Sequence, residues 1–115
     1  MLDKLVGPDI CELLATNQLD KVREVLDTWL PADLAGIVLN VPRAEQPRLI
    51  SALDPNVAAA TFAYLHEVAQ QRLLDELPDS ISARILNRMA PDDRTALLQD
   101  VPPEMRHRLL ALLTP

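Results

Sequence analysis

The chain has 115 residues, of which 49% are hydrophobic and 3% aromatic, and 17 acidic residues against 11 basic ones give a net charge of −6. This length supports one domain rather than two, so we expect a single domain over residues 1–115. The acidic balance argues against nucleic acid and against an anionic membrane surface as partners, because both present negatively charged phosphates.

Neither a membrane span nor a cysteine framework is encoded. No uninterrupted apolar run approaches the roughly 20 residues that cross a bilayer, so direct membrane insertion is not expected. Cys11 is the single cysteine, which excludes an intramolecular disulfide and a thiolate-rich zinc site. We therefore expect a cytoplasmic location.

The first predicted elements form a helical hairpin. Residues 9–16 are typical of a short helix that ends at Asn17 or a neighbour, and a second helix follows over residues 19–29. In this second segment the apolar residues fall on one face of a 3.6-residue period. They are Leu19, Val22, Val25, Leu26 and Trp29.

Regularly spaced prolines divide the rest of the chain. They are Pro31, Pro42, Pro55, Pro78, Pro91 and Pro102. The single long gap indicates two units whose internal proline is replaced near His66 and Glu67. Proline suits the start of a helix because its φ is fixed and its missing N–H would be unpaired there. The predicted helices are 32–40, 43–53, 56–65, 67–76, 79–88, 92–100 and 103–113.

A common template recurs after these prolines, with apolar residues at offsets +3, +7 and +8. Leu34, Val38 and Leu39 follow Pro31 in this way. Such short helices with short links cannot be stable alone and must stack on their neighbours. No segment alternates with the period of two that a strand requires. The sequence therefore predicts an all-α array of stacked short helices.

Catalytic signatures are missing from the sequence. His66 and His107 are far apart and belong to no metal-binding His pair, so both are expected at the surface. The links between helices contain no glycine-rich phosphate loop. We expect no enzymatic activity. Five further residues are predicted to pack in the core rather than to line a ligand pocket: Cys11, Trp29, Phe62, Tyr64 and Met89.

Acidic residues gather at the helix junctions. The first interpretation is that these acids cap the helices, because carboxylates near a helix N-terminus meet free N–H groups and the positive end of the helix dipole. The second interpretation is that some of these acids form half of a magnesium site, because Mg²⁺ keeps much of its water and takes only one or two carboxylates from a surface. The candidates are Asp54, Asp75, Glu76, Asp79, Asp92, Asp93, Asp100 and Glu104.

Several segments resemble the N-terminal cytosolic domain of MgtE-type magnesium transporters. The resemblance covers about residues 10–113, and the most specific part is the junction Leu30-Pro31-Ala32-Asp33-Leu34-Ala35. It continues in Leu53-Asp54-Pro55, Leu74-Asp75-Glu76-Leu77-Pro78 and Met89-Ala90-Pro91-Asp92-Asp93-Arg94. This resemblance implies a right-handed superhelical solenoid of short helices, similar to armadillo-like scaffolds and to the flagellar rotor protein FliG.

The resemblance also implies a function. In that family the domain precedes CBS domains and a membrane channel in one chain, and the channel works as a homodimer. Magnesium bound between acids of the N domain and of the CBS domains draws the two together and keeps the channel shut. This resemblance places one such acid at Asp92. Together with the acidic helix junctions, it leads us to predict Asp92 and Asp93 as the magnesium-contacting residues, with Asp75, Glu76 and Asp79 as weaker candidates.

The chain departs from the family pattern at two acidic positions. The family's second acid in the segment after Pro91 falls on Ala96, and another falls near Ala60. We therefore keep an alternative function, in which the domain is a free-standing armadillo-like scaffold that binds protein without metal. The end at Pro115, just after a predicted helix, favours an excised domain over a free-standing one.

Overall fold

The computed structural model describes residue 10, residues 12–26 and residues 28–113. Every regular element in this part of the chain is helical, which confirms the all-α prediction. The elements are α2 (Leu19–Leu26), α3 (Pro31–Asn40), the 3₁₀ helix η1 (Arg43–Glu45), α4 (Gln46–Ala52), α5 (Pro55–Ala63), α6 (Glu67–Glu76), α7 (Asp79–Arg88), α8 (Pro91–Asp100) and α9 (Pro103–Leu112).

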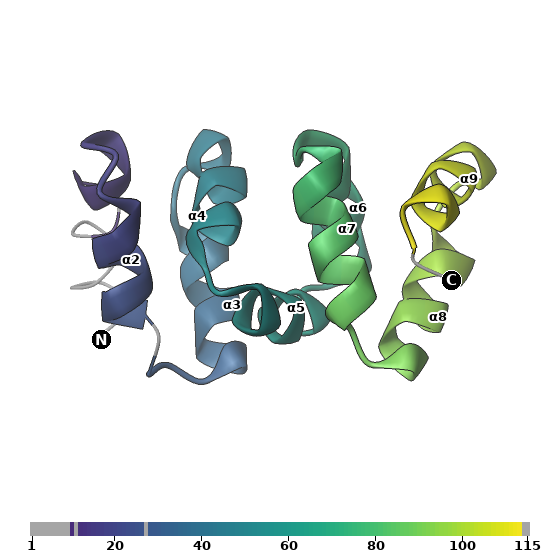
Figure 1. The fold of residues 1–115 in the computed structure, drawn as a ribbon, viewed down its shortest axis with the longest axis horizontal. Coiled ribbons are helices and arrows are strands. Elements are labelled where there is room, and N and C mark those ends of the chain that lie inside the picture. Colours follow the sequence, from purple (N-terminus) through teal and green to yellow (C-terminus); the bar gives the residue numbers. More distant parts are fainter. Residues whose placement is uncertain (1–9, 11, 27, 114–115) are drawn as a thin grey trace.

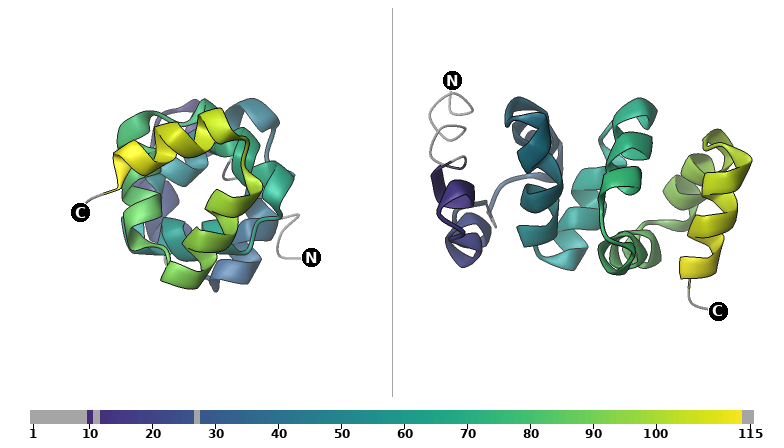
Figure 2. Two further views of the ribbon diagram at one scale, coloured as in Figure 1. Left: turned by 90° about the vertical axis from the view of Figure 1, so that its right-hand side faces the viewer. Right: turned by 90° about the horizontal axis from the view of Figure 1, so that it is seen from above.

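The helices follow one another along the long axis of an elongated molecule, with α2 at one end and α8 and α9 at the other (Figure 1). The principal extents are 39 × 24 × 22 Å. Seen down the long axis, the helices lie around a common centre (Figure 2). The right-handed superhelical sense implied by the family resemblance stays a prediction.

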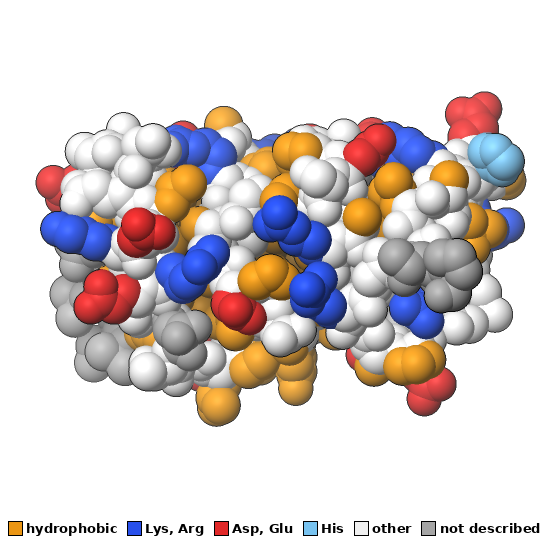
Figure 3. Space-filling view, in the orientation of Figure 1, with side chains coloured by type: hydrophobic (Ala, Val, Ile, Leu, Met, Phe, Trp, Pro, Cys, Tyr) orange, Lys and Arg blue, Asp and Glu red, His pale blue; other side chains and the backbone are white. Residues whose placement is uncertain are grey.

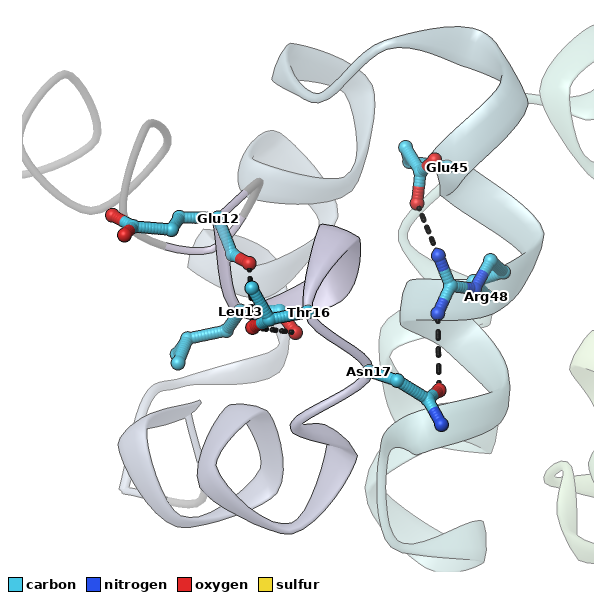
Figure 4. A network of polar contacts seen from close by, with 6 residues as sticks. All are labelled: Glu12, Leu13, Thr16, Asn17, Glu45 and Arg48. Atoms are coloured by element: carbon cyan, nitrogen blue, oxygen red, sulfur yellow. Dashed lines mark hydrogen bonds and ion pairs between the residues drawn. The ribbon is translucent and has the colours of Figure 1, made fainter.

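Asn17 ends the first helix, as predicted. It has a φ of 59°, in the left-handed region that asparagine tolerates. The N–H of Gln18 donates to the Leu13 carbonyl at 2.8 Å and that of Asn17 to the Leu14 carbonyl at 3.1 Å, the hydrogen-bond pattern of a Schellman motif. Arg48 of α4 donates to the Asn17 side chain at 3.2 Å (Figure 4). The first hairpin is therefore tied to α4.

The predicted helix 43–53 is divided, because Pro47 has no N–H to donate to the carbonyl four residues earlier. Residues 43–45 form the 3₁₀ helix instead, and α4 begins at Gln46 so that Pro47 lies in its first turn. The other boundaries from residue 31 onward lie within two residues of the predicted ones.

Five of the described helices share one design, in which a buried apolar residue follows the last residue of the helix. Val41, Leu53, Leu77, Met89 and Val101 are C-caps with extended backbone angles, and each is at most 5% exposed. Val41, Leu77 and Val101 directly precede a proline, which biases their backbone toward this extended region, whereas Leu53 and Met89 lie two residues before one. The chain thus turns within two residues while still contributing a side chain to the core.

The core is one continuous cluster that runs the length of the described molecule. Phe62 and Met89 are buried, as predicted, and Trp29 packs partly buried against the cluster. The prediction for Tyr64 was wrong, because its side chain is 64% exposed. Tyr64 lies after the last residue of α5, where the helix ends and its side chain leaves the buried face. Cys11 lies outside the described residues.

The repeating template holds only in part. The residues at offsets +3 and +7 after Pro31, Leu34 and Val38, are buried, but Leu39 at +8 is 41% exposed. Val25 is also exposed, although it falls at a predicted core position of α2. Each of these helices buries a narrower stripe than its apolar residues suggest.

Candidate functional site

Hydrogen bonds from side chains complete the ends of several helices. Asp54 and His66 act as N-caps: Asp54 Oδ1 accepts from the Asn56 N–H at 3.0 Å, and His66 Nδ1 accepts from the Ala69 N–H at 3.3 Å. Both histidines are exposed, as predicted. His66 thus has a structural role at the position where the proline series is interrupted.

The arginines divide into two groups. Arg94, Arg106 and Arg108 are half-buried and donate to carbonyls near helix C-termini. Helix ends leave carbonyls without intrahelical partners, and these guanidinium groups satisfy them. Arg84 and Arg88, in contrast, are exposed and have no hydrogen bond or ion pair within the described part of the chain.

The acids of the α6–α7 junction are partly neutralised by neighbouring arginines. Asp75 Oδ1 lies 3.5 Å from Arg108 Nη1. Glu76 faces two arginines, with Oε1 at 3.8 Å from Arg43 Nε and Oε2 at 3.9 Å from Arg72 Nη1. These contacts favour a structural role for Asp75 and Glu76 over cation binding.

Asp79, Asp92 and Asp93 are in a different setting. All three are exposed in the first turns of α7 and α8, and none forms an ion pair with a described residue. The negative charge of adjacent Asp92 and Asp93 is therefore left uncompensated by direct partners at the start of α8. Of the predicted magnesium contacts, Asp92 and Asp93 are the two that lie side by side with no ionic partner among the described residues.

A groove of about 270 Å³ lies between α5 and the α7–α8 junction. Its lining is Asn56, Ala59, Ala60, Ala63, Tyr64, Arg88, Met89, Ala90 and Asp93. Helix α5 packs directly against α7, which holds the two sides of the groove together (Figure 1). Ala60, where the family resemblance expects an acid, therefore lies in the same groove as Asp93, while Ala96 is exposed one turn along α8.

The donor chemistry fits half of a magnesium site. Carboxylate oxygens are suitable ligands for Mg²⁺, and Asp92 and Asp93 supply two. Among the described residues, no group of three or more Asp, Glu, His or Cys side chains is arranged to hold a metal ion. A cation at α8 would need further oxygens from water or from another surface.

Arg88 is a charged residue of the groove that the sequence analysis did not single out. A signal was present: neither Arg84 nor Arg88 has an acid three or four residues away within α7. On an exposed helix face, the charge of an arginine is usually balanced by an acid three or four residues away, and neither of these two arginines has such an acid in its own helix.

The broad surface in Figure 3 carries acidic and basic side chains side by side, with hydrophobic ones between them and along its lower edge. No single-sign patch of the kind that binds nucleic acid covers this face. Within the described residues, no helix has both the length and the hydrophobicity to cross a bilayer.

These features define an all-α protein built from short stacked helices. At the start of α8, beside a small groove, two acidic side chains have no ionic partner among the described residues. The family model of the MgtE intracellular N domain matches residues 29–115, and the chain belongs to this family. The match confirms the resemblance and makes the chain the N-terminal, intracellular domain of a magnesium transporter. A comparison with curated proteins finds no match.

Proposed function

We propose that this domain senses cytosolic magnesium and regulates its transporter through an interface with CBS domains of the same protein. The observation that carries the proposal is the exposed, unpaired position of Asp92 at the start of α8, next to Asp93. Family membership supplies the transporter context.

The mechanism is electrostatic and involves no covalent chemistry. Two acidic surfaces repel each other, and a hydrated divalent cation between them makes their contact favourable. At low magnesium the N domain would separate from its partner, and at high magnesium it would dock and hold the channel shut. Asp92 is the leading residue, because Asp93 shares the groove with the positive Arg88, which disfavours a cation there.

This domain is also proposed to have no enzymatic role. His66 is engaged as a helix cap, and His107 lies at the surface of α9, far from it in sequence. The alternative, a scaffold that binds protein without metal, draws support from the exposed Tyr64 and from the groove beside it.

The isolated domain should bind magnesium weakly, because half of the site belongs to its partner. Titration with MgCl₂, followed by backbone amide chemical shifts, should move the first turn of α8 with a millimolar midpoint. Asp92→Asn should remove most of this response. Asp75→Asn is the matched control, since Asp75 is already paired with Arg108 and its loss should leave the response at α8 unchanged.

Tight binding to the lone domain, or chemical-shift changes centred on the α6–α7 junction, would contradict this assignment. The coding sequence beyond Pro115 gives a separate check. CBS domains and membrane spans downstream agree with the proposed interface, whereas a stop codon there would favour the scaffold.

A further inference from the structure

A second hollow lies at the link between α2 and α3, toward the opposite end of the molecule from α8 (Figure 1). It has a volume of about 260 Å³ and is lined by Thr28, Trp29, Leu30 and Asp33. None of these residues borders the groove beside α5, so the two surfaces are separate. The proposed magnesium interface gives this link no role.

Leu30 departs from the pattern of the other helix starts. It is the N-cap of α3, and its side chain is 68% exposed. The N-caps of the other described helices from η1 to α9 are proline, alanine, glutamate, aspartate or histidine, none of which is a bulky apolar residue. Leucine is also a poor N-cap, because its side chain offers no acceptor to the free N–H groups of the first turn. Leu30 therefore contributes neither to the core nor to a cap.

Trp29 and Asp33 give the hollow its chemistry. Trp29 is half-buried against the core and also lines the hollow, so Leu30 is not an isolated apolar residue of the surface. Asp33 is exposed in the first turn of α3 and forms no ion pair or side-chain hydrogen bond with a described residue. The face of a tryptophan ring attracts cations, and a carboxylate pairs with them. The hollow thus places two cation-binding groups beside an exposed apolar side chain.

We propose that this hollow binds a segment of a partner protein that carries an arginine next to a bulky apolar residue. Arginine fits better than lysine, because its planar guanidinium group stacks on an aromatic ring and donates two N–H groups to one carboxylate. The guanidinium would lie between Trp29 and Asp33, and the apolar neighbour would cover Leu30. The net charge of −6 would attract a basic segment over a longer range.

Tryptophan fluorescence reports on this surface directly, because Trp29 is the single tryptophan of the chain. The probe is the capped pentapeptide Gly-Leu-Arg-Leu-Gly, titrated into the domain in EDTA so that magnesium plays no part. Its binding should change the emission in a saturable way, with a dissociation constant of about 1 mM or lower. The same peptide with citrulline in place of arginine should bind at least about threefold more weakly, since citrulline keeps the shape but lacks the charge.

Asp33→Asn tests the charge pair. It should weaken binding of the arginine peptide by about three- to tenfold and leave binding of the citrulline peptide unchanged. Measured together, the two proteins and two peptides form a double-mutant cycle that isolates the interaction of Asp33 with the guanidinium. Asp20→Asn is the matched control. Asp20 is also an exposed, unpaired acid in the first turn of a helix, but it does not line the hollow, so this variant should bind like the wild type.

Leu30→Ser tests the apolar part of the surface. Serine is a favoured N-cap, so the variant should melt at or above the wild-type temperature. It should nevertheless bind the arginine peptide at least about threefold more weakly, because the apolar contact is lost. Leu110→Ser, which changes an exposed leucine of α9, is the control and should bind the peptide like the wild type.

Emission that stays flat up to about 10 mM peptide would overturn the proposal. Equal binding of the arginine and citrulline peptides, or equal behaviour of Asp33→Asn and Asp20→Asn, would overturn it as well. Binding of N-acetylarginine amide as tight as that of the pentapeptide would assign the hollow to a small cation instead. Emission that changes with protein concentration alone would assign it to a second copy of the chain. A failure of magnesium binding at Asp92 would alter none of these results.

Discussion

The centre of the molecule and its C-terminal end are held together by different interactions. Helices α5, α6 and α7 each bury three or four residues, whereas α8 and α9 each bury a single leucine, Leu97 and Leu109. The C-terminal pair is instead held by side chains that donate to backbone carbonyls. Arg106 and Arg108 of α9 donate to Leu98 and Leu74, and Asn87 of α7 donates to Leu112 of α9.

This difference follows from position in a stack of helices. A central helix has neighbours on both sides and can bury a broad apolar face, while a terminal one has a neighbour on one side only. With less apolar area to bury, polar bonds to otherwise unsatisfied carbonyls contribute a larger share of the stability. Hydrogen exchange should accordingly be slowest in α5–α7 and faster in α8–α9.

The largest effect is expected when the centre loses a buried side chain. Leu86→Ala removes a fully buried leucine of α7 and should lower the free energy of unfolding by about 2–5 kcal/mol. Chemical denaturation measures the loss. Leu110→Ala on α9 is the control: Leu110 is 51% exposed, and its replacement should cost less than about 0.5 kcal/mol. Equal losses at the two positions would show that the assignment of buried faces is wrong.

An intermediate effect is expected when the C-terminal end loses the hydrogen bonds of Arg106. Arg106 donates to the carbonyls of Leu98 at 2.7 Å, Gln99 at 3.1 Å and Val101 at 3.2 Å. Arg106→Ala leaves these carbonyls with fewer partners and should lower the free energy of unfolding by about 1–3 kcal/mol.

The matched control for Arg106 is Arg84→Ala, which removes an exposed arginine that has no bond to a described residue. That change should lie within about 0.5 kcal/mol of the wild-type value. If Arg106→Ala were as harmless as Arg84→Ala in the same denaturation series, the α8–α9 pair would be held by apolar contacts like the centre.

The smallest effect is expected from a hydroxyl in the central region. Thr61 on α5 is fully buried, and its Oγ1 has no hydrogen-bond partner among the described residues. Thr61→Val replaces this unsatisfied group by a methyl group of similar shape, so the unfolding free energy should stay unchanged or rise by up to about 1 kcal/mol. Thermal melting resolves this difference. A clear loss would mean that the hydroxyl contributes a stabilising contact, and that the centre depends on more than apolar burial.

The proline and leucine patterns predicted most of the fold, because they report local physics. The fixed φ of proline and the extended bias of the residue before it act within a few residues. The helix starts at Pro31, Pro55 and Pro91 can therefore be predicted from the sequence to within one residue. Pro47 likewise indicates the start of a helix, which is where the structure has it. It lies too far inside the predicted helix 43–53 to be accommodated there, and the helix is divided as a result.

The candidate site was only partly predictable. The position of Asp92 and Asp93 at a helix start follows from their place directly after Pro91. Their lack of ionic partners does not, because the same composition of acids and arginines leaves Asp75 paired with Arg108, 33 residues further along the chain. The unpaired charge of Arg88 could not be predicted either, because ion pairs form between residues that are distant in the sequence.

The sequence by itself determined that this chain is all-helical, where nearly every helix begins and ends, and which family it belongs to, because helix spacing and proline positions act locally. Only the tertiary structure decided which arginines bond to helix ends, which acids remain unpaired, and that Ala60, Arg88 and Asp93 share a groove. Those outcomes depend on how helices distant in sequence pack side by side, and burial and charge pairing are set by that packing.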